Sequence, residues 1–299
     1  MKKILVTGAN GQLGQCLQKI SSQFEEFEFI FTDSETLDIT NKEEVNDFFW
    51  QNAPDFCINA AAYTAVDLAE TDIEKAFLVN ADGAENLAEA CAENNAQFIH
   101  VSTDYVFDGE NNLAYTEEDF TNPLGVYGAS KLAGDELALE VNPCSVILRT
   151  SWVYSEFGKN FVKTMLNLFA TKDELNIVAD QFGQPTYAND LAEAIMKIIK
   201  SEKITPGIFN FSNLGRISWF DFAEKIAELS EAKIKLNAIE TSQYPTPAKR
   251  PKNSVLDLDK ISKTYAVPLK PWEESLEDCV QILQNNSNEK NLIHIYSII

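Results

Sequence analysis

Two residues four apart in the sequence, Tyr127 and Lys131, are the side chains best suited to proton chemistry. On a helix this spacing puts them on one face. A phenol held beside an ammonium is a proton donor that works near neutral pH. The same spacing also fits an ordinary solvated helix face, so the motifs around the pair must decide between the two interpretations.

A glycine turn near the N-terminus is the first of these motifs. The apolar run Ile4-Leu5-Val6 leads into Gly8-Ala9-Asn10-Gly11-Gln12-Leu13-Gly14, and we expect a helix to begin near Gln12. Glycines permit the tight turn and the close approach of a pyrophosphate, while amides at the helix start face its negative charge. The pattern therefore predicts a dinucleotide site. Its predicted contacts in the turn are Gly8, Asn10, Gly11, Gln12, Leu13 and Gly14.

Asp33 stands at the end of the second predicted strand, 19 residues after Gly14. A carboxylate there accepts hydrogen bonds from the adenosine ribose. Because it repels the additional phosphate of NADPH, this position favours NADH, although Ser34 and nearby hydroxyls leave the use of both cofactors open. Further candidates are Asp38 and Ile39 for the adenine pocket and Ala60, Ala61 and Ala62 for close cofactor approach. Their alternatives are a turn carboxylate and a tight crossing of strand and helix.

Strand-like runs alternate with helical segments over residues 1–150. The predicted strands are residues 3–7, 27–32, 56–60, 97–102 and 145–149, with helices starting at Asn41 and covering residues 74–92. This alternation predicts a mostly parallel sheet covered on both faces, with ligands beyond the carboxyl ends of its strands. The fourth run ends in the hydroxyls of Ser102 and Thr103 shortly before Tyr127. His100, in the same run, is interpreted as a strand residue rather than a catalyst.

The second half of the chain is less regular and richer in proline. Helical segments near 160–171, 189–200 and 219–230 alternate with short strands near 175–178 and 208–211. The predicted fold is therefore α/β: a Rossmann-type doubly wound parallel sheet in residues 1–150, with later segments able to return to it, and a smaller C-terminal α/β substrate domain in residues 151–299. Asn285–Asn288 is predicted to be a solvated linker. The apolar tail 292–299 is either an edge strand or an oligomer contact.

Composition excludes several classes of protein. A net charge of -22 repels nucleic acid and anionic membranes, so anionic ligands need local donors such as helix N-termini. No apolar stretch reaches the length of a spanning helix. The chain has only two histidines, too few to favour a histidine metal centre or a serine-histidine triad. The five scattered cysteines are interpreted as reduced thiols. We expect a cytoplasmic protein without nucleic-acid or membrane partners.

Together these motifs resemble the extended short-chain dehydrogenase/reductase family over nearly the whole chain, and most closely its reductases of nucleotide-linked deoxysugars. The blocks that carry the resemblance are residues 8–14, 59–67, 102–109, 126–131, 149–154, 180–186 and 250–254. It implies NADPH or NADH as cofactor and a dTDP-linked 4-keto-6-deoxysugar as substrate, reduced at C4.

The resemblance also implies roles for individual residues. Tyr127 protonates the C4 carbonyl oxygen as hydride arrives from the nicotinamide, and Thr103 hydrogen-bonds that oxygen. Lys131 lowers the pKa of Tyr127 and holds the nicotinamide ribose. Asn80 supports a proton relay beside the cofactor, with a helix residue facing water as the alternative. Substrate contacts are implied for Thr64, Thr103, Asp104, Tyr105, Trp152 and Arg250. The Arg250 fork suits a diphosphate, and the alternative for Trp152 is a core aromatic.

Other activities on the same scaffold stay open. A dehydratase carries two acids after the hydroxyl residue, whereas this chain has Asp104 followed by Tyr105. An epimerase of nucleotide sugars, another reductase, or a non-catalytic subunit similar to the regulatory subunit of methionine adenosyltransferase are the alternatives. Some relatives resemble metal-bridged dimers, but Gln15, Cys16, Asn189 and Asp190 form a poor set for a hard cation. We predict no required metal, and a homodimer is one option for the oligomeric state.

Overall fold

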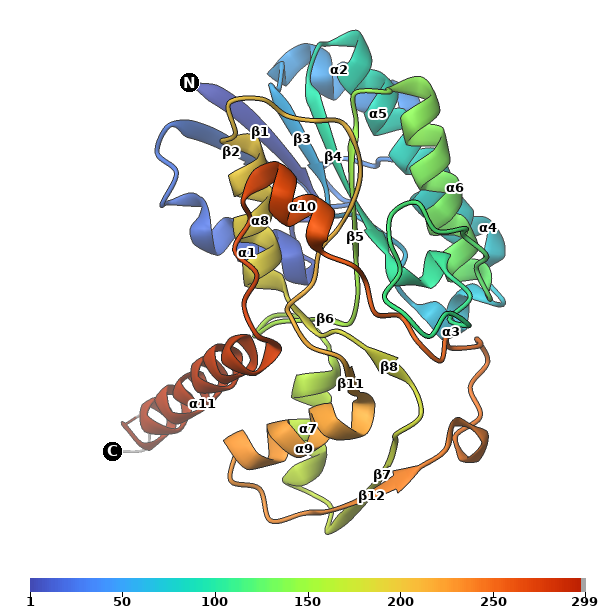
Figure 1. The fold of residues 1–299 in the computed structure, drawn as a ribbon. Coiled ribbons are helices and arrows are strands. Elements are labelled where there is room, and N and C mark those ends of the chain that lie inside the picture. Colours follow the sequence, from blue (N-terminus) through green and yellow to red (C-terminus); the bar gives the residue numbers. More distant parts are fainter. Residues whose placement is uncertain (297–299) are drawn as a thin grey trace.

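A six-stranded parallel sheet organises the larger part of the molecule. The computed structural model describes residues 1–296, with side chains through residue 286. The sheet order is β10-β5-β4-β3-β1-β2, and every neighbouring pair is parallel (Figure 1). Its strands are β1 (Lys2–Thr7), β2 (Phe27–Phe31), β3 (Phe56–Asn59), β4 (Gln97–Thr103), β5 (Val146–Thr150) and β10 (Gly207–Asn210). The chain order reverses between β1 and β3, which is where ligands bind in open sheets of this kind.

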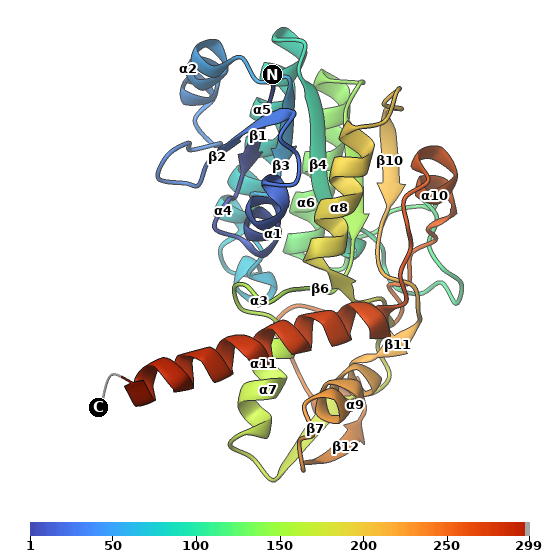
Figure 2. The ribbon, with the colours of Figure 1, turned by 90° about the vertical axis from the view of Figure 1, so that its left-hand side faces the viewer.

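Helices cover both faces of this sheet because its strands are apolar on both sides. Ile4 and Val6 point to one face and Leu5 to the other, as the alternation of a strand requires. Helices α1 (Gln12–Ser21) and α8 (Ala188–Ile199) pack together on the first face, beside α10 (Asp259–Tyr265). Helices α2 (Lys42–Asn52), α5 (Gly83–Glu93) and α6 (Val126–Val141) cover the second (Figure 2).

The predicted elements of the sheet are confirmed with small shifts at their ends. The first five predicted strands are β1 to β5, and α1 begins at Gln12 as expected. Asn41 caps α2, since its side chain accepts hydrogen bonds from the amides of Glu43 and Glu44. The helix predicted over residues 74–92 is α4 (Ile73–Phe77) and α5, joined by a π-helical turn at Leu78–Asp82.

A smaller group of elements from the second half of the chain lies below the sheet in Figure 1. It comprises α7 (Phe161–Phe169), α9 (Trp219–Leu229), α11 (Trp272–Tyr296) and the paired strands β7 (Glu174–Val178) with β12 (Lys235–Ile239). Short strands β6 (Val153–Tyr154), β9 (Thr186–Tyr187), β8 (Phe182–Gly183) and β11 (Ile217–Ser218) lead into it. Its core is largely aromatic, with Tyr154, Phe222 and Trp272 buried together.

The C-terminal region departs from the expectation. The predicted linker at Asn285–Asn288 is wrong, because α11 continues through these residues to Tyr296. The role suggested for the tail 292–299 falls outside the described residues, apart from the helical backbone to Tyr296. Among the helices of residues 1–296, none is long and apolar enough to cross a membrane.

Candidate active site

A cavity of ≈ 300 Å³ opens where the carboxyl ends of β1, β2 and β3 meet, at the reversal of strand order. Nine residues predicted to contact the cofactor line it: Gly8, Asn10, Gly11, Asp33, Asp38, Ile39, Ala60, Ala61 and Ala62. Ser34, already named beside Asp33, also lines it, and four further lining residues were missed, namely Thr7, Leu37, Thr40 and Val79. The missed residues are chain neighbours of predicted ones, so extending each motif by one or two positions would have found most of them.

Gly8 forms the floor of this cavity, and no other residue fits there. Its φ of +68° lies in the left-handed region, and an added Cβ would come 2.6 Å from the backbone nitrogen of Ala61. Because the first glycine of the turn has no side chain, the backbone after β1 can approach the backbone after β3, and this part of the cavity is bounded by backbone atoms. Exposed backbone and small side chains suit a pyrophosphate, so the residues present fit a dinucleotide.

Asp33 lines the same cavity and is oriented by its own turn. Its Oδ1 accepts hydrogen bonds from the amides of Glu35 and Thr36, while its Oδ2 accepts from Asn10 Nδ2 at 2.6 Å. The Thr36 hydroxyl and these amides hold the pKa of Asp33 below its ordinary value. The carboxylate is thus charged and fixed at the position expected for ribose recognition.

Several predicted cofactor residues make structural contacts within the protein. Leu13 and Gly14 are buried where α1 packs on the turn. Gln12 faces the smaller group of elements, where its Oε1 accepts from Asn160 Nδ2 at 2.8 Å and from the Ser155 hydroxyl at 3.0 Å. Asp38 lines the cavity and also accepts from the amide and hydroxyl of Thr40, as a turn carboxylate does.

Tyr127 and Thr103 are brought together at the start of α6. An added Cβ at Gly128 would lie 2.2 Å from the Tyr105 carbonyl oxygen, so glycine allows α6 to approach this segment. The rings of Tyr105 and Tyr127 meet edge to face at 5.5 Å. Burial raises the pKa of Tyr127 to about 12, and a hydrogen bond with Thr103 opposes that rise. The phenol is therefore protonated at neutral pH, as an acid must be.

Asp104 lies directly beside this pair, almost fully buried. Its Oδ1 accepts from the Thr103 hydroxyl at 3.0 Å, and its Oδ2 has no hydrogen-bond partner within the described part of the chain. Burial raises the pKa of Asp104 to about 6, against the stabilising effect of Ser254 and Thr103. A second, weakly acidic carboxyl thus stands next to the hydroxyl that contacts Tyr127.

Lys131 is held by His100 and the backbone of Val101 in this structure. Its Nζ lies 2.8 Å from the Val101 carbonyl oxygen and 3.0 Å from His100 Nε2, fully enclosed. Burial lowers the pKa of Lys131 to about 8, with Asp135 acting in the opposite direction. Burial is the largest influence on the Tyr127 pKa and raises it, and the expected lowering of that pKa by Lys131 stays a prediction.

Asn80 is buried, which contradicts the alternative of a water-facing residue. Its Oδ1 accepts from the Tyr63 amide at 2.8 Å, and its Nδ2 donates to the Tyr63 carbonyl at 3.1 Å and to the Ser130 hydroxyl at 3.0 Å. Asn80 thereby connects the π-helical turn to the segment that follows β3 and to α6. Its amide is committed to these partners rather than turned toward Lys131.

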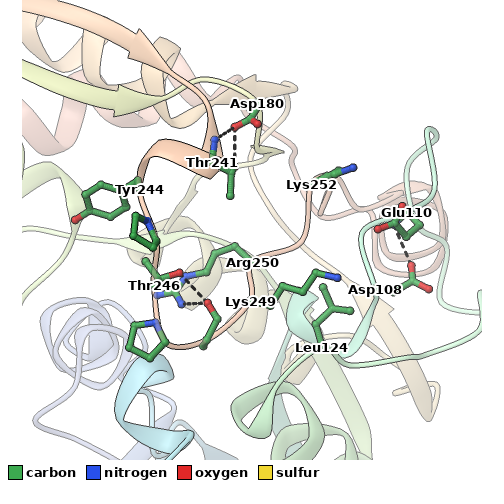
Figure 3. A pocket seen from close by; sticks show the side chains of 13 residues that line it. Asp108, Glu110, Leu124, Asp180, Thr241, Tyr244, Thr246, Lys249, Arg250 and Lys252 are labelled. Atoms are coloured by element: carbon green, nitrogen blue, oxygen red, sulfur yellow. Dashed lines mark hydrogen bonds between the residues drawn. The ribbon is translucent and has the colours of Figure 1, made fainter.

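Arg250 lies on a wall of a second cavity of ≈ 540 Å³. Figure 3 shows Tyr244 and Thr246 on one side of this cavity and Asp108 and Glu110 on the other, with Arg250 between them. Other lining residues include Leu124, Asp180, Thr241, Lys249 and Lys252. The guanidinium is already paired with the carboxylate of Asp67, from α3 (Val66–Ala69). This partner was not anticipated, although Asp67 ends one of the recognised blocks.

The other predicted substrate residues differ in exposure. Thr64 is exposed after β3, whereas Tyr105 is half-buried against Tyr127. Trp152 stacks on Trp219 with ring centroids 3.5 Å apart, and an added Cβ at Gly183 would touch its ring. Half-buried with φ of +47°, Trp152 packs as an aromatic of the smaller group of elements.

The neighbourhood considered for a bridging metal is used internally. Asp190 Oδ1 lies 2.7 Å from Lys270 Nζ, and its Oδ2 accepts from Asn213 Nδ2 and the Ser275 hydroxyl. In the part of the chain that the structure describes, no three His, Cys, Asp or Glu residues group as metal ligands. The absence of a required metal stays a prediction.

A cavity at the reversal of a parallel sheet, with Thr103 at the carboxyl end of the adjacent strand β4 and Tyr127 at the start of α6, is the arrangement of a dehydrogenase/reductase of the Rossmann type. Residues 1–285 match the family described as RmlD substrate binding domain, and the chain belongs to this family.

Known relatives agree over almost the full length. A dTDP-4-dehydrorhamnose reductase of Aggregatibacter actinomycetemcomitans is 45% identical, covering 93% of this chain and 98% of the relative. That of Escherichia coli is 40% identical, covering 90% and 94%. Among solved structures, a dTDP-4-dehydrorhamnose reductase of Clostridium acetobutylicum superposes with a TM-score of 0.91 at 44% identity, covering 94% and 99%. One of Bacillus anthracis in complex with NADP gives 0.89 at 39%, covering 93% and 99%.

Proposed function

We propose that this chain is a dTDP-4-dehydrorhamnose reductase, which uses NAD(P)H to reduce the C4 keto group of dTDP-4-dehydro-6-deoxy-L-mannose to dTDP-L-rhamnose. The observation that carries the proposal is the cavity at the carboxyl ends of β1, β2 and β3, with Thr103 at the end of β4 and Tyr127 packed on the following Tyr105, in a chain 40–45% identical to reductases of that name. The activity is that of an oxidoreductase.

In the proposed mechanism the protein supplies the proton and the orientation. A reduced nicotinamide dinucleotide, when bound, supplies the hydride to the carbonyl carbon. Tyr127 donates its phenolic proton to the C4 oxygen, and the Thr103 hydroxyl hydrogen-bonds the same oxygen as negative charge develops. Lys131 stabilises the phenolate left behind once its ammonium reaches Tyr127. Such positioned proton transfer contributes about 10²- to 10⁴-fold to a rate.

The nucleotide part of the substrate is proposed to occupy the larger cavity. Arg250 stands on its wall within electrostatic range of Tyr105, and Tyr105 packs on Tyr127. A sugar held at Tyr127 would therefore extend its diphosphate toward Arg250, whose fork donates in pairs to such oxygens. Lys249 and Lys252 add positive charge to a strongly acidic protein there.

The assay that tests the function is consumption of reduced cofactor with purified protein and the dTDP-4-keto sugar. A reductase oxidises one NAD(P)H per sugar reduced, whereas an epimerase returns its hydride and shows no net consumption. A non-catalytic subunit shows no consumption with any sugar, so absence of turnover with both cofactors would refute the proposal.

The mass of the protein measured in solution tests whether it forms a homodimer. The cysteines at positions 16, 57, 91, 144 and 279 are all unpaired, which supports a cytoplasmic location.

A further inference from the structure

A chain of buried hydrogen bonds runs beneath the active site from β1 to α6. The Thr7 hydroxyl donates to Asn59 Oδ1 at 2.7 Å, and Asn59 Nδ2 lies 3.0 Å from His100 Nδ1. His100 Nε2 in turn lies 3.0 Å from Lys131 Nζ, which donates to the Val101 carbonyl. The three polar side chains of β3, β4 and α6 are all at most 1% exposed. The mechanism proposed above uses only the last of them.

The backbone fixes the direction of this chain. Asn59 Oδ1 also accepts from the Ala61 amide at 3.1 Å, and an amide N–H can only donate. The oxygen of Asn59 must therefore face Ala61, which turns its NH₂ group toward His100. Since NH₂ has no lone pair to offer, His100 Nδ1 must accept. A neutral imidazole that accepts at Nδ1 carries its proton on Nε2.

This tautomer matters for Lys131. His100 presents an N–H to the lysine, and an ammonium, which only donates, cannot accept it. A neutral amine can, because its lone pair accepts from Nε2 while one N–H donates to Val101. Burial is the main cause that holds the pKa of His100 well below its ordinary value, so the imidazole is not the charged partner. Burial also lowers the pKa of Lys131 to about 8, so the neutral amine that this pattern requires becomes the main form above that pH.

Titratable and charged side chains surround this chain of hydrogen bonds. Asp135, one turn beyond Lys131 on α6, places Oδ1 3.8 Å from His100 Nε2. Its Oδ2 is 3.3 Å from Arg149 Nε of β5 and accepts from the Ser102 hydroxyl of β4. Asp104 and Tyr127 are further titratable groups of the neighbouring elements. Asp135 favours the charged form of Lys131 and burial disfavours it, and the contact with His100 is the hydrogen bond that differs between the two forms.

We propose that His100 and Asn59 are positioning residues of the active site. They hold Lys131 near the carboxyl ends of β3 and β4 as a neutral amine, and in this way they set how much of Lys131 is protonated at a given pH. On protonation, Lys131 loses its acceptor contact with His100 and is released toward Tyr127 and the cofactor. The proposal rests on the proposed function only for what the released ammonium does. The tautomer of His100 and its link to Lys131 hold whatever the substrate.

The first test reads the tautomer directly and needs no turnover. The chain has only two histidines, His100 and His294, so ¹⁵N-histidine labelling gives two imidazoles, and a His294→Gln variant assigns them. At pH 9 the ¹⁵N shifts of His100 should be those of a neutral ring protonated on Nε2. A ring protonated on Nδ1, or an imidazolium, would overturn the proposal. Failure of the reductase function would leave this spectrum unchanged.

The second test reverses the tautomer with a near-isosteric change. In Asn59→Asp the carboxylate still accepts from Thr7 and Ala61 but requires a proton on His100 Nδ1, so a lone pair faces Lys131. The alkaline limb of the kcat/KM profile, which follows loss of the ammonium, should move up by about one pH unit or more. The ¹⁵N spectrum should show the Nδ1-protonated ring. An unmoved limb with a reversed tautomer would refute the link to Lys131.

The added charge of the aspartate needs its own control, which a double variant supplies. If Asn59→Asp acts through the His100 imidazole, it should no longer move the alkaline limb of the kcat/KM profile when His100→Gln is also present. A through-space effect of the carboxylate would still move that limb in the double variant. The persistent effect would contradict the proposal. His100→Gln alone can offer its carbonyl oxygen to the ammonium, so its limb should also rise. Thermal unfolding and titration of reduced cofactor by fluorescence check that each variant is folded.

Discussion

Asp67 and Arg250 lie 183 residues apart in the sequence and form a two-pronged ion pair, with Oδ1 2.6 Å from Nη1 and Oδ2 2.8 Å from Nη2. The pair joins α3, beside the sheet, to the loop that forms one wall of the larger cavity. Arg250 Nη1 also donates to the Ala248 carbonyl. The guanidinium is thus held in one orientation, but its strongest contacts are already made to a carboxylate. A diphosphate binding here must share or displace Asp67.

Arg250→Ala is expected to raise KM for the nucleotide sugar about ten- to a hundredfold while changing kcat much less, because charge-assisted hydrogen bonds contribute about 1.5–3 kcal/mol. Asp67→Asn is the matched variant, which keeps Arg250 and removes the competing charge, so KM should fall. Steady-state kinetics at constant ionic strength measure both. An unaltered KM in Arg250→Ala rules out contact with the diphosphate, and a raised KM in Asp67→Asn means that Asp67 is needed to orient the arginine.

Tyr127→Phe should lower kcat by about 10²- to 10⁴-fold, since the ring stays in place but the proton donor is lost. Cofactor affinity should change little, and Tyr63→Phe, which removes a phenol bonded to Asp72 near the surface, should retain activity. Initial rates with each reduced cofactor give the comparison. Equal turnover in Tyr127→Phe and in the unmodified chain would remove Tyr127 from the acid role.

The sequence was sufficient for the sheet and for most of the cofactor cavity because both depend on local patterns. Ile4 to Val6 must form a buried strand, and Gly8 must stand at a left-handed turn that contacts β3. Each prediction needed only residues close together in the chain. The same holds for the start of α2, where the Asn41 cap is visible in the sequence.

The interactions that sequence reasoning missed are those between distant segments. No sequence pattern near Asp67 predicts Arg250 as its partner. His100 likewise resembles any polar residue in an apolar run. Its contact with Asn59 follows from the register of β3 and β4, which pairs exactly these two positions only once the sheet is assembled. The orientation of Lys131 toward Val101 likewise depends on how α6 packs on β4. Side-chain direction in a buried network is a tertiary property.

Asp33→Ala tests the basis of cofactor choice. The charged carboxylate, held by Asn10 and the Thr36 turn, should favour ribose hydroxyls and disfavour the additional phosphate of NADPH. The variant should therefore lose affinity for NADH by about tenfold and retain or gain affinity for NADPH. Equilibrium titration of both cofactors measures the ratio. If the ratio is unchanged, Asp33 does not contact the ribose.

Asp104 gives a prediction about stability and pH. Its pKa in the folded protein is raised from 3.8 to about 6, chiefly by burial. Between these values the folded state binds a proton that the unfolded state has released, so the carboxyl favours folding in acid, and that contribution is lost as pH rises through about 6. At pH 8 the buried charge costs about 3 kcal/mol on this basis, at about 1.4 kcal/mol per unit of pKa.

Asp104→Asn removes the titration and should therefore be more stable than the unmodified chain at pH 8, by about 1–3 kcal/mol, with the difference vanishing near pH 4. Urea unfolding of both proteins across this range measures the difference directly. Asp108→Asn is the control, because hydrogen bonds from the Glu110 amide and the Tyr115 hydroxyl lower the pKa of Asp108, so its variant should lose stability above pH 4 instead. If Asp104→Asn behaves like Asp108→Asn, the carboxylate of Asp104 is well solvated or paired in solution, and it cannot be the weakly acidic group beside Thr103 that its burial implies.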